Sequence, residues 1–445
     1  MLNLGLRLRQ GKHTYFPLDS IKGAVAAYSL DKLVAGQDKT IRVTNDLLQE
    51  KDIGFLGSSI DEGALLEFCE DVEYENLVVN GDFSDGTAGW IALNSTSSVE
   101  NNILRNTGDG ANRNVGGIRE DKIYLKAGSN NRKYLRAELM ILNDDCDDMS
   151  LYFSRDAGAP GGKFIHGDSF IINPIKDNWY TISIVQEAGD VHDDIWIYFR
   201  HRYQDASIAT GKQFKIRNVF SVDMGNDDSN PLYNLTAEQM NELFPFVDGT
   251  GTVPISAYIN TWYDQSGNGN HATQATLDSM PRIVHNGVIE REPITQEIAM
   301  RFNGINNFLQ SQFGLTYQQP YTIVAKAKRV EGSNTGYVYD NTNDTVALIY
   351  EDNNDSNVNA GEMLNIHDDN TSLNVDIAVF DGVNSKVYKN GVLVATANAG
   401  SNSLNGIEIG RKNDNSSFLE GHISDIIIFD RALTESEIER LSNRL

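Results

Sequence analysis

The chain has 445 residues, of which 62 are acidic and 37 basic, so its formal net charge at pH 7 is −25. A chain this acidic repels phosphate, which argues against nucleic acids and anionic membranes as partners. With 40% hydrophobic residues it can build a substantial core, and no apolar run approaches the ~20 residues of a membrane-spanning helix. Its two cysteines, Cys69 and Cys146, are too few for a disulfide framework or a cysteine-based metal site.

Residues 1–22 differ from the rest of the chain in their charge. Arg7, Arg9, Lys12 and Lys22 are basic in a segment with a single acidic residue. Such an arm could dock on an acidic partner surface, and a terminus that is basic by chance is the alternative. The arginines also interrupt the apolar stretch that a signal peptide requires, so we expect synthesis in a cytoplasm.

From residue 23 onward the chain is typical of short strands. Apolar β-branched runs recur at roughly ten-residue spacing between Asn, Asp, Gly and Ser, which predicts an all-β chain of jelly-roll β-sandwiches. The clearest hairpin is 385–396, where Asn390-Gly391 can take the positive φ of a type I′ turn. The few helices are expected at 29–34, 61–71, 235–244 and 434–445.

Residues 76–223 open with NLVVNGDFSDGTAGW and close with FKIRNVFSVD. This stretch resembles the carbohydrate-binding-module type of galactose-binding-like jelly roll. Phe83 and Trp90 are then expected to anchor the first strand in the core. The resemblance also implies a structural Ca²⁺ near the first and last strands, which here would involve Asp82 and Asp223.

The C-terminal part of the chain carries a second resemblance. MRFNGINNFLQ at 300–310, VFDGVNSKVYKNGVLVAT at 379–396 and EGHISDIIIFDRALTESEI at 420–438 follow one another in order. This segment looks like a concanavalin A-like jelly roll of the laminin-G-like kind.

A third resemblance joins two distant segments. Residues 23–55 and the INTWYDQSGNGNHATQ run at 259–274 resemble the start of the α-L-arabinofuranosidase B catalytic domain, where these pieces are close in sequence. We therefore expect a discontinuous domain of residues 23–72 plus 226–445, with residues 73–225 as a jelly roll inserted in a surface loop. This mosaic resembles phage virion appendages, meaning head fibres and tail-associated adhesins.

The sequence contains no recognisable catalytic motif. It has no G-x-S-x-G, H-E-x-x-H, P-loop or C-x-x-C. Nothing after residue 274 matches the arabinofuranosidase segments that carry the catalytic carboxylates, so we expect no enzyme and assign no catalytic residue. In the 263–266 motif, Asp264 or Gln265 could contact a sugar, and the alternative, which we favour, is that Asp264 and Ser266 cap a turn made possible by Gly267 and Gly269.

The predicted glycan-binding surface is the strand DIWIYFRHRYQ at 194–204. Period-two alternation places Ile195, Ile197 and Phe199 on the core side. The opposite side pairs aromatic rings, which can stack on a sugar, with planar guanidinium donors. Its members are Trp196, Tyr198, Arg200 and Arg202. The alternative is that this side lies under loops or at a subunit interface.

Taken together, these patterns predict a non-enzymatic structural or adhesive virion component of a bacteriophage. Its basic arm, residues 1–22, would bind other virion proteins, and its jelly rolls would bind host or environmental glycans. The resemblance implies a homo-oligomer, often a trimer. Two alternatives remain: a glycoside hydrolase of the α-L-arabinofuranosidase type, and a cellular carbohydrate-binding adhesion protein.

Overall fold

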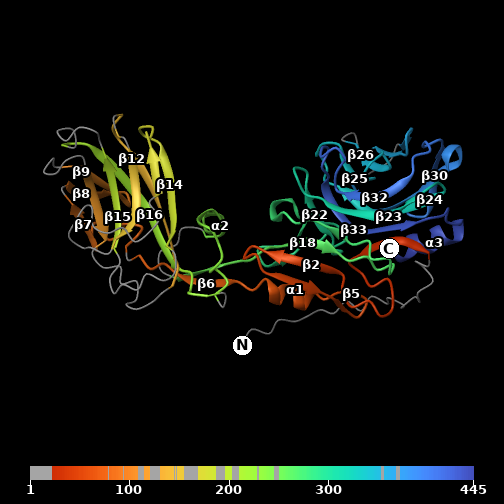
Figure 1. Ribbon diagram of the computed structural model, residues 1–445, viewed down its shortest axis with the longest axis horizontal. Coiled ribbons are helices and arrows are strands. Elements are labelled where there is room, and N and C mark those ends of the chain that lie inside the picture. Colours follow the sequence, from red (N-terminus) through yellow and green to blue (C-terminus); the bar gives the residue numbers. More distant parts are fainter. Residues whose placement is uncertain are drawn as a thin grey trace. The chain divides into compact units, whose positions relative to one another are not determined.

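The computed structural model describes most of the chain after residue 22 (Figure 1). The described residues are 23–78, 80–93, 95–108, 115–120, 131–144, 146, 148–154, 169–186, 196–202, 210–227, 230–244, 250–351, 355–366 and 371–445. The chain divides into unit 1, Met1–Glu70 with Pro254–Leu445, and unit 2, Asp71–Val253. No helix of the described residues is long and apolar enough to cross a membrane. The predicted arm, residues 1–22, lies outside the described residues.

Unit 2 is a sandwich of two five-stranded sheets. One sheet has the order β13-β12-β15-β10-β7 and the other β14-β11-β16-β9-β8. The strands are β7 (Trp90–Leu93), β8 (Ser95–Glu100), β9 (Ile103–Gly108), β10 (Val115–Glu120), β11 (Lys133–Ile141), β12 (Asp148–Ser154), β13 (Ser169–Ile172), β14 (Trp179–Gln186), β15 (Trp196–Arg202) and β16 (Gln213–Asp223). Both sheets contribute to one apolar core, with Leu135 from β11 and Leu151 from β12 fully buried in it.

The start of this sandwich is fixed as the sequence predicted. Phe83 and Trp90 are buried, with their ring centroids 5.1 Å apart. The Trp90 indole N–H donates to the carbonyl of Asn80 at 3.1 Å. Gly81 lies so close to the last strand that a Cβ there would meet the Val219 carbonyl oxygen at 2.1 Å, which explains why the turn requires glycine.

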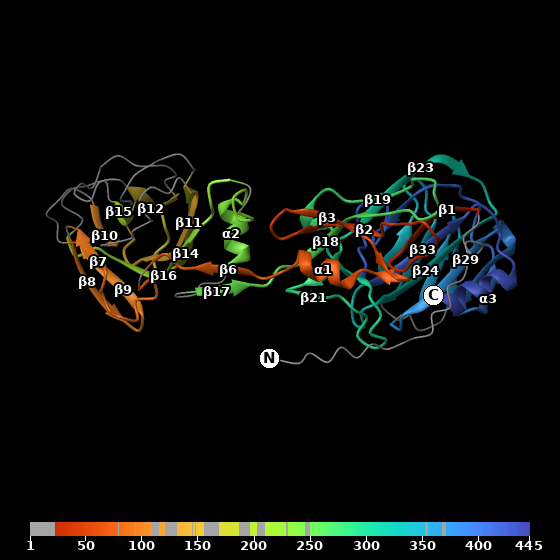
Figure 2. The same ribbon diagram turned by 90° about the horizontal axis from the view of Figure 1, so that it is seen from below.

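The chain enters and leaves unit 2 on paired strands. Strand β6 (Val72–Glu75) is antiparallel to β17 (Thr250–Val253), with Val72 opposite Val253 (Figure 2). The expected exit at residue 225 is wrong, because helix α2 (Ala237–Leu243) belongs to unit 2. At its end, Phe244 packs edge-on against Tyr74 at 4.9 Å.

Unit 1 is a larger sandwich built from both flanks of the chain. One layer has the order β31-β30-β29-β24-β33, and β1 and β22 pair with the free edge of β33. The other layer has the order β28-β27-β26-β25-β32-β23-β19-β18-β2-β3. Strand β20 pairs with both β18 and β22 and so connects the layers.

The N-terminal elements of unit 1 are β1 (Ala24–Ser29), β2 (Ile41–Asn45), β3 (Glu50–Ile53), β4 (Phe55–Leu56), β5 (Ser59–Ile60) and α1 (Glu62–Phe68). Those after unit 2 are β18 (Ala257–Trp262), β19 (Ala272–Thr273), the 3₁₀ turn η2 (Leu277–Ser279), β20 (Arg282–His285), β21 (Val288–Ile289), β22 (Met300–Asn303), β23 (Leu309–Tyr317), β24 (Tyr321–Arg329), β25 (Gly336–Asp340) and β26 (Ala347–Tyr350). The remainder are β27 (Ser356–Asn359), β28 (Met363–Ile366), β29 (Asn374–Phe380), η3 (Gly382–Asn384), β30 (Ser385–Lys389), β31 (Val392–Ala397), β32 (Leu404–Ile409), β33 (Glu420–Phe429) and α3 (Glu435–Arg444).

Local signals in unit 1 were predicted correctly with one exception. The hairpin turn has Asn390 at φ 47° and Gly391 at φ 81°, as a type I′ turn requires. The apolar stripe of α3, Ile438 and Leu441, packs on the sheet as expected. The helix expected at 29–34 does not form, because Ser29 completes β1, which pairs with β33.

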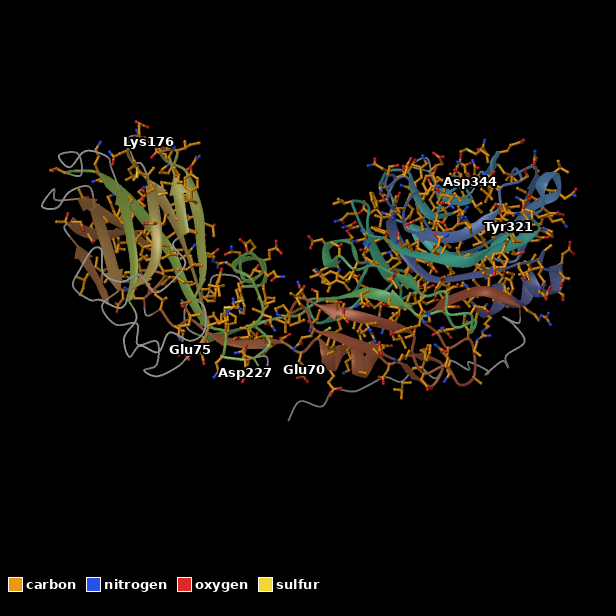
Figure 3. All side chains as sticks on the ribbon, viewed as in Figure 1. Glu70, Glu75, Lys176, Asp227, Tyr321 and Asp344 are labelled. Carbon is orange, nitrogen blue, oxygen red and sulfur yellow. The ribbon has the colours of Figure 1, made fainter. Side chains whose placement is uncertain are left out.

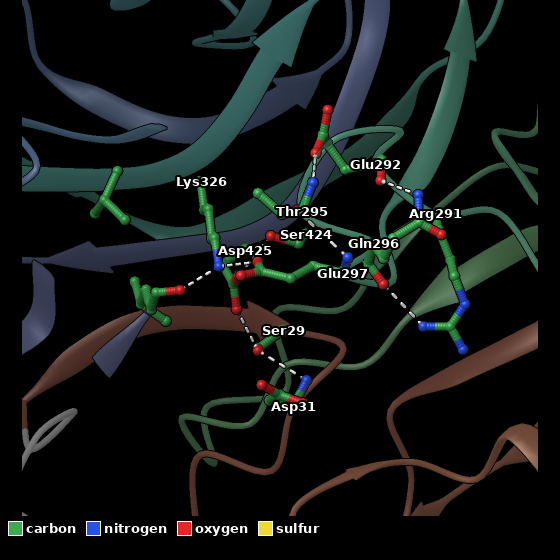
Figure 4. A network of polar contacts seen from close by, with 12 residues as sticks. Ser29, Asp31, Arg291, Glu292, Thr295, Gln296, Glu297, Lys326, Ser424 and Asp425 are labelled. Atoms are coloured by element: carbon green, nitrogen blue, oxygen red, sulfur yellow. Dashed lines mark hydrogen bonds and ion pairs between the residues drawn. The ribbon is translucent and has the colours of Figure 1, made fainter. Parts of the chain in front are cut away.

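A polar network lies between β1, β24 and β33 (Figure 4). Asp425 is buried and accepts hydrogen bonds from the hydroxyls of Ser29 and Ser424. Lys326, opposite Asp425 in the register, forms an ion pair with Glu297. Burial raises the pKa of Asp425 to about 6, a shift that the Lys326 charge and the hydroxyl hydrogen bonds oppose.

Candidate functional site

A row of polar residues crosses one layer of unit 1. Residues that are directly opposed in a β-ladder share a face of the sheet. Any two successive residues of the row are directly opposed in this way. The row contains hydroxyl, amide, guanidinium and carboxylate groups. Its members, in strand order from β32 to β3, are Glu408, Gln310, Thr273, Thr261, Arg42 and Asp52. Two pockets lie along this row of hydrogen-bonding groups.

The larger hollow on this row, which we call the Gln310 pocket, has a volume of about 400 Å³. The pocket is lined by amides, hydroxyls, an imidazole and one carboxylate, with no Phe, Tyr or Trp. Its lining residues are Gly269, Asn270, His271, Thr273, Gln310, Ser311, Gln312, Thr342, Asn343 and Glu408. Exposed Asp344, labelled in Figure 3, follows Asn343 on the loop after β25. A pocket of this composition suits a ligand rich in hydroxyl groups.

The single carboxylate of the Gln310 pocket is neutralised by a neighbour. Arg411 donates from Nε to Glu408 Oε2 at 2.9 Å, and its guanidinium lies 3.2 Å from the Phe308 ring centroid. Burial raises the pKa of Glu408, and the Arg411 charge opposes that shift. The pocket therefore offers oriented hydrogen-bonding groups with little net charge.

The loop that carries Asn270 and His271 is fixed by Asp264. The buried Asp264 carboxylate accepts from the backbone N–H groups of Ala27 at 2.9 Å, Ser266 at 2.8 Å and Asn270 at 3.0 Å. The Ser266 hydroxyl donates to the same carboxylate at 2.8 Å. Asp264 therefore joins two segments that are far apart in sequence, and its interpretation as a turn-forming residue is confirmed.

Gln265 has a similar structural role. Its Oε1 accepts from the Leu33 N–H at 2.8 Å, and its Nε2 donates to the carbonyls of Ser29 and Asp31, each at 3.0 Å. The side chain is buried, with 2% exposed. The Gln265 side chain therefore bonds to the N-terminal segment of unit 1.

A second hollow, which we call the Asn260 pocket, shares Thr273 with the first. Its volume is about 280 Å³. The residues that line it are Arg42, Glu50, Asn260, Thr261, Thr273, Gln274, Ala275 and Met280. Arg42 is bound by Asp52, with Nε–Oδ1 at 2.7 Å and Nη2–Oδ2 at 3.1 Å. Hydrogen bonding to Arg42 holds the pKa of Asp52 well below its usual range.

The glycan-binding strand predicted in unit 2 forms β15, the middle strand of its sheet. Ile197 and Phe199 are buried in the core, as the alternation predicts. The side chains of Trp196, Tyr198, Arg200 and Arg202 lie outside the described residues, so their sugar-binding role stays a prediction. Ser150 and Asp148 face Arg200 and Arg202 in the register and are buried.

The predicted calcium ligands do not come together. Asp223 accepts from the Asn131 amide at 2.9 Å, while Asp82 accepts from the Ser84 N–H at 3.0 Å. The segment before β7 runs beside β16, where the Leu77 N–H donates to the Ser221 carbonyl and the Gly81 carbonyl accepts from the Val219 N–H. Asp82 therefore lies beside Val219, and Asp223 lies four residues further along β16, roughly 13 Å away. No cluster of three potential metal ligands exists among the described residues.

Comparisons with known proteins agree with the lectin-type fold of unit 1. Residues 314–439 match the family model of the concanavalin A-like lectin/glucanases superfamily, as the resemblance implied. No curated protein matches the sequence. The all-β sandwich fold is thus supported by both the strand pairings and the family match.

Solved structures with similar folds are distant. An arabinose-bound α-L-arabinofuranosidase has 12% identity and a TM-score of 0.28, covering 38% of this chain and 29% of its own. A pentraxin from Limulus polyphemus has 21% identity and a TM-score of 0.26, covering 32% and 80%. A xylan-binding domain from Paenibacillus barcinonensis has 13% identity and a TM-score of 0.25, covering 32% and 97%. TM-scores this low carry no argument about function.

The sequence analysis missed the residues that line the two pockets. A signal for part of them exists in β23, where exposed Gln310 and Gln312 alternate with buried Leu309, Ser311 and Phe313. Period-two alternation identifies such residues as facing outward. It does not show that β23 places these residues beside Thr273 of β19, because that pairing joins residues far apart in sequence.

Proposed function

We propose that this chain is a non-enzymatic structural or adhesive component of a phage particle, and that unit 1 binds surface glycans. The Gln310 pocket is the observation that carries the glycan-binding part of the proposal. Its amide and hydroxyl lining matches the alternating donors and acceptors of sugar hydroxyls. The match of residues 314–439 to the concanavalin A-like family also supports glycan binding. The virion role rests on the basic residues 1–22 and the mosaic of segments in the sequence.

The geometry gives little support to the hydrolase alternative. Glycoside hydrolysis needs two carboxyl groups roughly 5–9.5 Å apart. The only carboxylate of the Gln310 pocket is Glu408, whose register partner on β25 is Asp340. Asp340 is fully buried and accepts from the backbone N–H groups of Asn341, Val346 and Asn413. A carboxylate bound in this way is not presented to a substrate, which favours binding without catalysis.

Two experiments test the two parts of this proposal. For glycan binding, native gels containing soluble arabinan, xylan or capsular polysaccharide should retard the wild-type protein, and Gln310→Ala should migrate as without polysaccharide. Gln318→Ala is the matched control, because Gln318 is exposed and lines neither pocket. For the virion role, a chain lacking residues 1–22 should fold but fail to enter particles. Wild-type occupancy of the truncated chain would assign attachment elsewhere.

A further inference from the structure

The Asn260 pocket contains two buried amide groups of fixed orientation. Asn260 Nδ2 donates to Thr44 Oγ1 and to Glu50 Oε1, both at 2.9 Å. A carboxylate only accepts hydrogen bonds, so the nitrogen must face Glu50 and Asn260 Oδ1 must face away from it. Gln274 Oε1 accepts from the Thr276 N–H at 2.9 Å. A backbone N–H only donates, so Gln274 Nε2 must be the atom directed away from Thr276.

The backbone places these two side chains next to each other. Gln274 N–H donates to the Asn260 carbonyl at 2.8 Å, one step beyond the Thr261–Thr273 pair of β18 and β19. The register of β18 against β2 shifts between Ile259 and Thr261, which leaves Asn260 as an extra residue. Such an irregularity redirects a side chain, and it is how Asn260 and Thr261 both come to line the pocket.

The two atoms directed away from these partners are an unsatisfied acceptor and an unsatisfied donor. Within the described part of the chain, neither Asn260 Oδ1 nor Gln274 Nε2 has a hydrogen-bond partner. Asn260 is 8% exposed and Gln274 9% exposed. Most buried side-chain polar atoms have a hydrogen-bond partner, so an acceptor and a donor left open in one pocket point to a polar ligand group that bonds to both.

We infer that Asn260 and Gln274 form a subsite for one neutral sugar ring, an assignment that rests on the proposed glycan-binding function. A sugar hydroxyl donates to Asn260 Oδ1 and accepts from Gln274 Nε2, which satisfies both atoms with one group. The volume of about 280 Å³ is just below the usual range of ligand pockets, about 300–1,000 Å³, and suits a single ring. The shared Thr273 makes this subsite continuous with the Gln310 pocket.

The charges around the subsite select against acidic sugars. Glu50 lines the pocket, and its carboxylate would repel a uronic acid carboxylate. Arg42, the cation of the lining, is already bound in a two-point contact by Asp52. The subsite therefore favours an uncharged hexose or pentose.

The test follows the side-chain amide of Gln274 by NMR in protein labelled with ¹⁵N-glutamine. The Gln274 signal is the one missing from Gln274→Glu, a variant that retains the Oε1 acceptor for Thr276 and whose fold is checked by its melting curve. Methyl glycosides of glucose, galactose, mannose, arabinose and xylose are titrated, together with glucuronic and galacturonic acid. At least one neutral glycoside should shift this signal saturably, and the acids should not.

The variants distinguish a sugar subsite from a purely structural amide pair. Gln274→Glu should weaken binding of the shifting glycoside about tenfold, the effect of losing one hydrogen bond. Gln318→Glu makes the same change at an exposed site outside both pockets and should leave affinity unchanged. If glycans bind the protein but never move the Gln274 signal, the two atoms are satisfied by each other or by water and the subsite is refuted. If no glycan binds at all, both the subsite and the proposed glycan-binding function are refuted.

Discussion

Replacing Asp264 by alanine should destabilise unit 1 strongly, although Asp264 belongs to a loop. The substitution removes a carboxylate that accepts four hydrogen bonds. It leaves the N–H of fully buried Ala27 without a partner. An unsatisfied buried donor costs about 1–3 kcal/mol, and each hydrogen bond to a charged group contributes about 1.5–3 kcal/mol. Because Asn270 is partly exposed and water can replace some of the bonds, we expect a net loss of about 2–4 kcal/mol.

Differential scanning calorimetry measures this effect directly. For a domain of this size, each kcal/mol lowers Tm by about 2–4 °C, so the transition of unit 1 should fall by about 5–15 °C. A chain lacking residues 71–253 identifies which transition belongs to unit 1. Asp278→Ala is the control, because Asp278 is an exposed aspartate in the same part of the chain. Equal melting temperatures for the two variants would show that Asp264 does not hold the loop to β1.

The remaining predictions concern the independent folding of unit 1, the pH dependence of its stability, the role of Trp196 and the absence of catalysis. Because β6 and β17 end side by side, deleting residues 71–253 with a short Gly-Ser linker should leave a cooperatively folded β-rich protein, and an aggregated product would argue against a separable unit 1. The pKa of Asp425 is raised to about 6, so the folded state binds this proton more tightly and its stability should fall as pH rises from about 4 to about 6. Asp425→Asn should flatten that slope in urea titrations, and an unchanged slope would assign it to other groups. Trp196→Ala should abolish any glycan binding by unit 2 with Tm unchanged if Trp196 is a stacking platform, whereas a large drop in Tm would place it in the core. No reducing sugar should be released from arabinan or xylan, and turnover that Glu408→Gln abolishes would overturn the non-enzymatic proposal.

The sequence predicted those parts of the fold that depend on local chemistry. The Asn390-Gly391 turn, the capping boxes at Thr236 and Thr434, and the Phe83–Trp90 anchor all have strong short-range causes. The exit from unit 2 was misplaced because residues 223–231 are turn-rich and polar, as a boundary would be. What keeps α2 in unit 2 is tertiary packing of Phe244 on Tyr74, which no local pattern reveals.

The candidate site was harder to predict for a physical reason. Each residue of the polar row comes from a different strand, and the pairing of β18 with β2 joins segments on either side of unit 2. Single-strand alternation identifies outward-facing residues but not their neighbours on the sheet. The aspartates predicted as calcium ligands show the converse error, because the turn that holds Asp82 lies beside Val219 of β16 while Asp223 is four residues further along that strand.

Glycan binding by the Gln310 pocket is the central claim, and a glycan array tests it most directly. The wild-type protein and a Gln310→Ala/Asn343→Ala double variant are applied to the same array, with Gln318→Ala as the control. Both substituted pocket side chains are exposed, so the fold should survive and can be checked by its melting curve. We predict that wild type and control bind the same restricted set of neutral glycans and that the double variant loses them. Binding by the double variant equal to wild type, or no binding by any of the three proteins, would contradict the claim.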